Sequence, residues 1–426
     1  MLTRSPVLLQ AVRSPAFLFF PVLSAAALMA CLRDPSAWVG DWSLTTMNIR
    51  TAIAGLAPLI TALGVWTGRA EARHGLGPLL AATPLPTWRR LAVRLGVTAG
   101  WAVTAYAVGA AGALAHTSGS ATWGSPPLAL LAGTFLGTLV WAALGFLIGT
   151  LWNSVFAVPA AAVACYAVDF LAGWYYDSSW HQLVPLGGLL FDEVTAYRPA
   201  ALYGQAAWLT GVLVLCLLGI ATAGRAVPRV PGLVALGVCV LPVAACALFV
   251  TRAGSLVERE PARMADLECR RTGTAAQPTV CLHPARRGAR QVTEAAVTDL
   301  SRALRGVKAI PTLFVQDAAD DIPGEAATFS YASRRPARDD LVRQLATQLT
   351  MPACAYAGST DGKGSTTALV ADLWLVQTAT GRRVEAGPEL NRAVAALGAL
   401  PAEDRAEHLS TVVGRARSCG APAARP

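Results

Sequence analysis

The stretch GRAEARHGLGPLLAATPLPTWRRLAVRLG, residues 68–96, lies between two strongly apolar segments. It contains a single acidic residue, Glu71, and five arginines, which are Arg69, Arg73, Arg89, Arg90 and Arg94. In a short loop beside membrane spans, positive charge marks the cytoplasmic side. This stretch therefore sets the expected topology of the apolar segments on either side of it.

Charge is distributed unevenly along the chain. The 426 residues are 54% hydrophobic and 14% charged, whereas soluble domains carry about 25% charged residues. Seven of the 26 acidic residues precede Thr251 and 19 follow it. The net charge of +9 is spread over both parts without the dense basic stripe of a nucleic-acid-binding protein. We therefore expect a membrane domain over residues 1–250, an extracytoplasmic domain over residues 251–426, and no nucleic-acid partner.

Seven apolar segments are candidate spans, because about 20 apolar residues cross a bilayer as a helix. They are residues 16–32, 51–67, 95–115, 128–152, 155–175, 206–223 and 230–250. Only Asn153 and Ser154 separate the fourth and fifth, which predicts a tight helical hairpin. Residues 1–13 lack the apolar core of a cleavable signal peptide, so the first span is expected to serve as an uncleaved anchor.

Basic residues in the short loops orient these spans. Nine fall on the side of Arg69–Arg94, and three, Arg33, Arg50 and Arg198, fall on the other. The asymmetry predicts a cytoplasmic N-terminus and an extracytoplasmic C-terminal domain.

Small and polar residues occur within the spans. Small residues four apart would let helix backbones approach closely, and the pairs are Gly96/Gly100, Gly133/Gly137 and Gly145/Gly149. The intramembrane acid Asp169 is a functional candidate by default. Its place near the outer end of its span also suits a hydrated position at the membrane–water interface. Between the fifth and sixth spans, residues 174–205 are rich in aromatic residues, which favours interfacial or re-entrant helices.

The organisation of residues 1–223 resembles the membrane subunit of ABC-2-type exporters. The shared features are a hairpin of spans, a basic cytoplasmic segment, a tight hairpin and re-entrant outer helices. The residues that carry the likeness are Glu71, Gly75, Leu79, Leu80, Thr83, Pro84 and Arg89. The short N-terminal helix, Pro78 and the appended seventh span and tail depart from the family pattern.

The resemblance implies that residues 71–84 dock on a separate ATPase subunit. A docking helix needs an apolar face and charged flanks that set its register. The implied coupling residues are Glu71, Arg73, His74, Leu76, Leu79, Leu80 and Pro84. The alternative is an ordinary positive loop resting on lipid headgroups.

ATP is expected on the partner subunit, and no cofactor is expected on this chain. A P-loop requires GxxxxGK[ST], and residues 358–366, GSTDGKGST, have the wrong spacing. The resemblance further implies a homodimer, or a heterodimer with another permease.

The C-terminal tail, residues 251–426, is expected to be a small α/β or α+β domain. Predicted strands cover residues 279–282, 310–316 and 328–331. Predicted helices cover residues 290–304, 339–353, 366–378, 388–400 and 402–417, where apolar residues such as Leu341, Leu345 and Leu349 recur on one face.

Four cysteines lie in the tail, and an even number in an exported domain favours disulfides. Of three possible connectivities we favour Cys269–Cys281 with Cys354–Cys419. Zinc is the rival interpretation, although no CxxC motif supports it.

No enzyme motif supports catalysis in the tail. Its two histidines, His283 and His408, fit structural roles, and residues 317–325 form an acidic cluster that lacks EF-hand spacing. The chain is therefore expected to be a non-enzymatic permease subunit of an ABC-2-type exporter in a bacterial plasma membrane. The alternative is a non-transporting anchor that displays a sensing or binding domain outside the cell.

Overall fold

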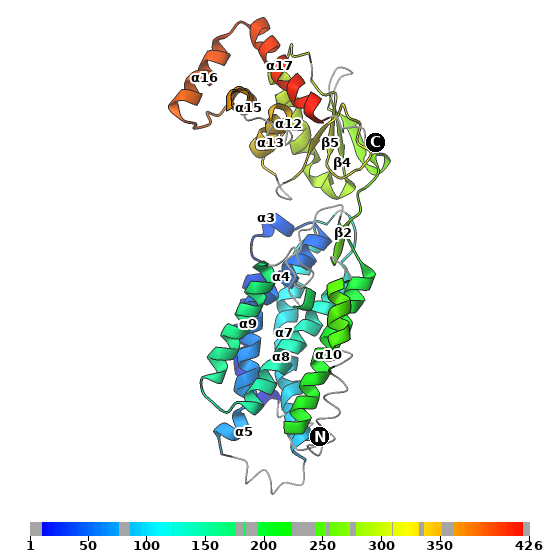
Figure 1. Cartoon of the computed structure of the whole chain (residues 1–426), viewed down its shortest axis with the longest axis vertical. Helices are drawn as coiled ribbons and strands as arrows, with labels where there is room; N and C mark the ends of the chain where they lie inside the picture. The colour runs from blue at the N-terminus through cyan, green and yellow to red at the C-terminus, as the bar shows by residue number, and fades with distance from the viewer. Residues whose placement is uncertain are drawn as a thin grey trace. The chain divides into compact units, whose positions relative to one another are not determined.

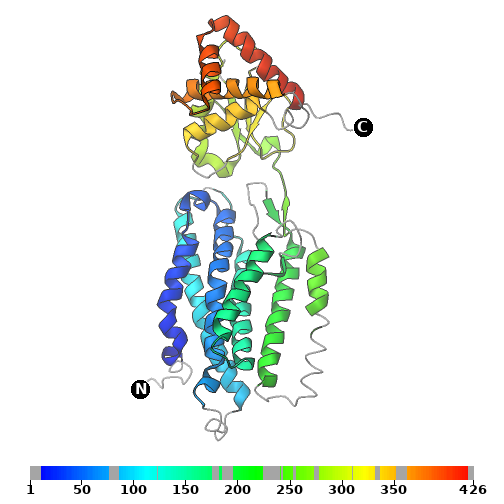
Figure 2. The same cartoon turned by 60° about the vertical axis from the view of Figure 1, so that its left-hand side comes forward.

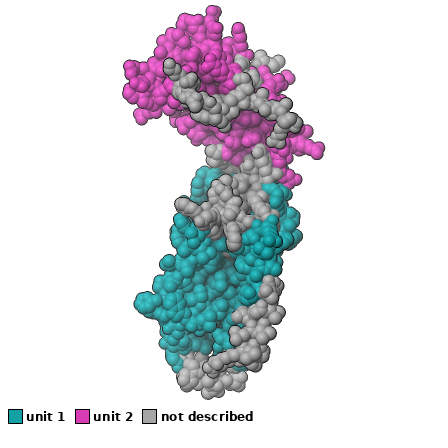
Figure 3. Space-filling model, in the orientation of Figure 1, with its two compact units in different colours: residues 1–259 teal, residues 260–426 magenta. Residues whose placement is uncertain are grey.

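The computed structural model describes residues 11–75, 86–121, 123–174, 182–184, 195–223, 240, 243–252, 256–272, 278–308, 310–331, 336–351 and 362–420. The chain forms two compact units, residues 1–259 and residues 260–426 (Figure 3). The predicted boundary at residue 250 falls slightly earlier. The difference arises because β2, Val257–Arg259, pairs antiparallel with β1, Thr195–Tyr197, and so belongs to the first unit.

The first unit is a bundle of helices that run side by side (Figures 1 and 2). The long helices are α2 (Pro15–Cys31), α4 (Trp42–Gly68), α7 (Thr87–Ser118), α8 (Leu128–Leu151), α9 (Ala157–Trp174) and α10 (Pro199–Ala223), and the short ones are α3 (Pro35–Trp38) and α5 (Ala70–Arg73). The hairpin predicted around Asn153 and Ser154 is present, since α8 and α9 are separate helices.

Four helices of the described residues, α4, α7, α8 and α10, are long and apolar enough to cross a membrane. Shorter apolar helices at Pro15–Cys31, Ala157–Leu171 and Val243–Arg252 overlap the other three predicted spans. The first unit is therefore compatible with membrane insertion, and the count of seven spans stays a prediction.

Helix α4 begins nine residues before the predicted span, which changes the place of Arg50. Asp41 caps the helix, accepting a hydrogen bond of 2.9 Å from the Leu44 backbone N–H, as aspartate commonly does at a helix start. The prediction that Arg50 lies in an outer loop is wrong, because Arg50 lies inside α4 and is 1% exposed.

Helices α4 and α8 pack through glycines on both sides, and we call this contact the glycine seam (Gly64, Gly68, Gly145 and Gly149). A Cβ atom on Gly64 would lie 2.6 Å from the Ala142 carbonyl oxygen, and one on Gly145 or Gly149 would overlap a backbone carbonyl of α4. The predicted packing role of Gly145/Gly149 is confirmed. Cβ atoms on Gly96, Gly100 and Gly133 would meet nothing within 4 Å, so those glycines form no such contact.

The second unit is a mixed four-stranded sheet covered by helices. Its strands are β3 (Glu268–Arg271), β4 (Thr279–Leu282), β5 (Leu313–Gln316) and β6 (Ala327–Phe329), in the order β3-β4-β5-β6. Strands β3 and β4 are antiparallel, and the other pairs are parallel. Its helices are α12 (Arg290–Ala303), α13 (Arg338–Thr350), α15 (Gly362–Thr380), α16 (Pro388–Ala399) and α17 (Ala402–Gly420), with 3-10 turns η2 (Met264–Asp266) and η3 (Pro284–Ala289).

A hydrophobic core holds the second unit together. Phe314 from β5, Leu300 from α12 and Leu345 from α13 are fully buried within it. The three predicted strands and five predicted helices are present, β4 with the predicted ends and the others with shifted ends, whereas β3 was not predicted. Its residues ECRR are mostly exposed, so no apolar pattern marks them as a strand.

Candidate functional site

The segment that follows α4 is tied back to the bundle by Glu71. Its carboxylate, on α5, lies 3.5 Å from Arg94 Nη2 and 3.9 Å from Arg90 Nε, both on α7. Gly75 ends this segment with a left-handed φ of 62°, a conformation that glycine adopts without steric cost. We call the Glu71–Arg90–Arg94 contact the glutamate clamp.

Arg73 and His74 lie beside the clamp and contact each other. The Arg73 guanidinium stacks over the Trp66 ring, 4.4 Å from its centre, and its Nη2 lies 2.9 Å from His74 Nε2. Arginine nitrogens can only donate, so His74 Nε2 accepts. The remaining coupling candidates, Leu76, Leu79, Leu80 and Pro84, lie outside the described residues.

A cavity of about 270 Å³ opens next to these residues, between the start of α2, the end of α4 with α5, and α7. Its basic lining residues are Arg13, Arg73, His74 and Arg94. We call it the basic cavity.

Arg50 is buried in the bundle and joins three parts of the chain. Its Nη2 donates to Gln205 Oε1 at 2.8 Å, and Gln205 Nε2 donates to the backbone oxygen of Gln182 at 2.7 Å. Within the described part of the chain, no carboxylate forms an ion pair with Arg50, and its Nε and Nη1 have no hydrogen-bond partner. A buried arginine without a carboxylate is a functional candidate in a membrane bundle. Sequence reasoning missed it, although the N-cap signal of Asp41 could have placed it within the helix.

Asp169 is buried on α9, with 7% exposure. Cys165 Sγ lies 4.0 Å from its Oδ2, and its Oδ1 has no hydrogen-bond partner among the residues described. The contacts therefore place Asp169 within the bundle, and no ion pair joins it to a cation among the residues described.

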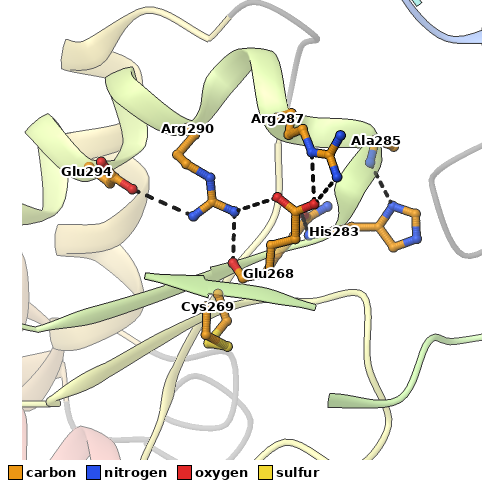
Figure 4. A network of polar contacts seen from close by, with 9 residues as sticks. Glu268, Cys269, His283, Ala285, Arg287, Arg290 and Glu294 are labelled. Carbon is orange, nitrogen blue, oxygen red and sulfur yellow. Dashed lines mark hydrogen bonds and ion pairs between the residues drawn. A yellow bond between two sulfur atoms is a disulfide. The ribbon is translucent and has the colours of Figure 1, made fainter. Parts of the chain in front are cut away.

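In the second unit, Glu268 on β3 gathers two arginines (Figure 4). It forms an ion pair with Arg287, and Arg290 Nη2 donates to its backbone oxygen at 2.8 Å. The hydrogen bonds from Arg287 lower the pKa of Glu268. Next to them, the backbone N–H of Ala285 donates to His283 Nδ1 at 3.2 Å, so His283 caps η3, in keeping with its predicted structural role.

The predicted disulfide between Cys269 and Cys281 is present and links β3 to β4 across directly paired positions. Cys354 lies outside the described residues, and the side chain of Cys419 is not described either.

Across the residues that the structure describes, no group of His, Cys, Asp or Glu side chains could hold a metal ion. The cluster around Glu268 joins β3 to η3 and to α12.

Comparison of the chain with protein-family models, curated proteins and solved structures finds no match. The class that the fold defines is a helical protein compatible with membrane insertion, joined to a small α/β unit.

Proposed function

We propose that this chain is the membrane subunit of an ABC-2-type exporter, driven by a separate ATPase subunit in a bacterial plasma membrane. The observation that carries the proposal is the glutamate clamp, in which Glu71 contacts Arg90 and Arg94. Coupling requires that movement of a docking segment be passed to the spans, and the clamp supplies that connection.

The connection reaches two helices at once. The segment leaves α4 at Arg69, and the clamp ties α5 to the first turns of α7. Helix α4 in turn contacts α8 through the glycine seam, where little side-chain material separates the backbones. A partner that displaces residues 76–85 would therefore pull on α4 and α7, and through α4 on α8.

The arginines at this end support a cytoplasmic orientation, since basic loops stay inside. With that orientation the second unit is extracytoplasmic, where its disulfide is stable. Two copies of the chain, or one with a related permease, would enclose the path.

Co-purification tests the proposal. The full chain is co-expressed with the ATPase encoded nearest to its gene, solubilised and captured. We expect the wild type to capture the ATPase, and the double variant Leu79→Arg, Leu80→Arg to lose it. Ser125→Arg, at an exposed position in the connection between α7 and α8, is the matched control and should retain it. Capture of no ATPase by the wild type would contradict the proposal.

The glutamate clamp has its own variant. Glu71→Gln removes the charge that holds Arg90 and Arg94 but leaves residues 76–85 unchanged. We expect the variant to capture the ATPase normally and to lose most ATP-driven transport. Equal loss of capture would assign Glu71 to docking instead.

A second candidate function is a non-transporting anchor that displays the second unit outside the cell. The observation that favours it is that this unit has its own hydrophobic core and disulfide. The two functions differ in ATPase capture. Both predict that an impermeant maleimide labels Cys269 and Cys281 in intact cells only after reduction, and labelling that requires lysis would contradict both.

A further inference from the structure

We propose that the basic cavity binds the phosphate group of an anionic phospholipid, with an acyl chain lying in a groove along α7. This inference does not depend on the exporter proposal. It rests on the charge, the unused hydrogen-bond donors and the surroundings of the cavity.

The cavity carries excess positive charge. Arg13, Arg73 and Arg94 line it, and among the described residues the acid that pairs with one of them is Glu71, which contacts Arg94 and is shared with Arg90. At least two arginine charges are therefore not balanced by a carboxylate in the described residues. A phosphate diester supplies one negative charge and several acceptor oxygens, and arginine is well suited to contact them.

Two of these arginines hold buried donors that are not used. Arg73 Nη1 and Arg94 Nη1 are both shielded from solvent and have no hydrogen-bond partner in the described part of the chain. Buried donors are normally satisfied, so turning either guanidinium toward acceptor oxygens of a ligand in the cavity would complete it. The volume of about 270 Å³ is many times the roughly 10–15 Å³ that a single water needs.

The cavity has the surroundings of a headgroup site. Trp66 and Trp88 at this end of the bundle are 36% and 42% exposed, and tryptophan concentrates at the level of lipid headgroups. The cavity also meets the N-terminus of α2, where Ser14 caps the helix. The positive end of a helix dipole adds to the attraction for an anion.

A mostly apolar groove of about 400 Å³ continues from the cavity along α7. Val97 lines both, and Gly96 and Gly100 form the open floor of the groove beside Trp101. Nothing lies within 4 Å of a Cβ built on either glycine. An apolar groove beside a basic cavity suits a lipid, because a free phosphate would use only the cavity.

Thermal unfolding of the purified full chain in detergent tests the proposal. The ligands are short-chain phosphatidylglycerol, short-chain phosphatidylcholine and inorganic phosphate. We expect phosphatidylglycerol to raise the midpoint of the wild type more than phosphatidylcholine does. Arg73→Gln should raise the phosphatidylglycerol concentration needed for a given midpoint shift about tenfold or more, as for loss of a hydrogen bond to a charged group. Arg13→Gln, at an exposed position, provides a second variant if Arg73→Gln folds poorly.

Matched controls separate the site from general surface charge. Arg89→Gln makes the same charge change at an exposed residue that does not line the cavity, and it should respond like the wild type. Gly100→Leu fills the groove and should weaken phosphatidylglycerol binding, whereas Gly133→Leu, at an open position on α8, should not.

Three results would overturn the proposal. Equal weakening by Arg89→Gln and Arg73→Gln would show surface attraction only, and equal effects of the two lipids would exclude a phosphate-charge site. A full response to inorganic phosphate with no effect of Gly100→Leu would overturn the lipid as occupant.

Discussion

The two units of this chain are stabilised by opposite kinds of residue. In the first unit, α4 and α8 meet through glycines whose backbones leave no room for a Cβ. In the second unit, the core is filled by large side chains such as Phe314, Leu300 and Leu345. The difference follows from the solvent that each sequence suits. Water drives large apolar side chains together, whereas lipid offers no such force, and helices there associate through close backbone packing.

The comparison also holds for charged groups. In the second unit, Glu268 meets Arg287 and Arg290 in direct hydrogen bonds at the surface. In the first unit, the glutamate clamp is looser, at 3.5 and 3.9 Å, and Arg94 Nη1 has no hydrogen-bond partner among the described residues. Arg290 likewise has two donors, Nε and Nη1, without a hydrogen-bond partner among the described residues, so the two clusters differ in how closely the carboxylate is held and not in unused donors.

The largest effect is expected in the glycine seam. Gly145→Leu places a side chain where the Thr61 carbonyl already lies, so α4 and α8 must separate. We expect loss of monodisperse protein in size-exclusion chromatography, because overpacking of this severity exceeds the usual cost of about 1–3 kcal/mol. Gly133→Leu on the same helix is the control. If the two variants behave alike, the seam does not stabilise the bundle.

The next effect is expected in the core of the second unit. Leu345→Ala leaves a cavity at a fully buried position on α13. We expect the free energy of unfolding of this unit to fall by about 2–5 kcal/mol. Pulse proteolysis of the full chain in urea, followed through a C-terminal tag, measures it. A change below about 1 kcal/mol would contradict a hydrophobic core at this place.

Removal of the disulfide should have a smaller effect. Cys269→Ala with Cys281→Ala opens a loop whose ends are 12 residues apart, which is expected to cost about 2–3 kcal/mol on loop-entropy grounds. The same proteolysis assay measures it, and reduction of the wild type should reproduce it. A variant as stable as the oxidised wild type would contradict a stabilising role.

The smallest expected effect is a gain of stability rather than a loss. Burial raises the pKa of Asp372 on α15, while a hydrogen bond from Thr347 acts against the rise. A raised pKa means that the folded state binds the proton more tightly. The contribution of this group to the free energy of unfolding is therefore fully present below the unfolded pKa of about 3.9. It is lost as the pH rises through the pKa of the folded state.

Asp372→Asn should consequently raise the thermal unfolding midpoint of the second unit at neutral pH. It should also flatten the dependence of that midpoint on pH between the folded and unfolded pKa values. Asp404→Asn, at an exposed position on α17, should change neither. A lower midpoint for Asp372→Asn would mean that the carboxylate makes a favourable charged contact.

Much of the fold follows from periodicity and length. The hairpin around Asn153 is predictable because a mostly apolar stretch of 48 residues, 128–175, exceeds what one span needs, and α13 is predictable from Leu341, Leu345 and Leu349. Strand β3 was missed because ECRR shows no alternation and pairs with β4 through its backbone. Arg50 was misplaced because charge usually ends a span, and only packing from α4 and α10 shows that it is buried.

The candidate sites were predictable in part. Sequence identified Glu71, Arg73 and His74 as one segment, but their neighbours from α2 and α7 come from far along the chain. Arg13 and Arg94 join Arg73 around one cavity only because three helices meet there, and linear spacing does not encode that meeting.

By itself, the sequence determined the division into an apolar helical part and a charged α/β part, because hydropathy and charge act locally along the chain. It also determined the pairing of Cys269 with Cys281 as the favoured short link. Only the tertiary structure decided which glycines are packed and which are open, since Gly145 and Gly100 occupy the same kind of motif. The physical reason is that a small residue permits close approach, but the neighbouring helix decides whether that space is filled.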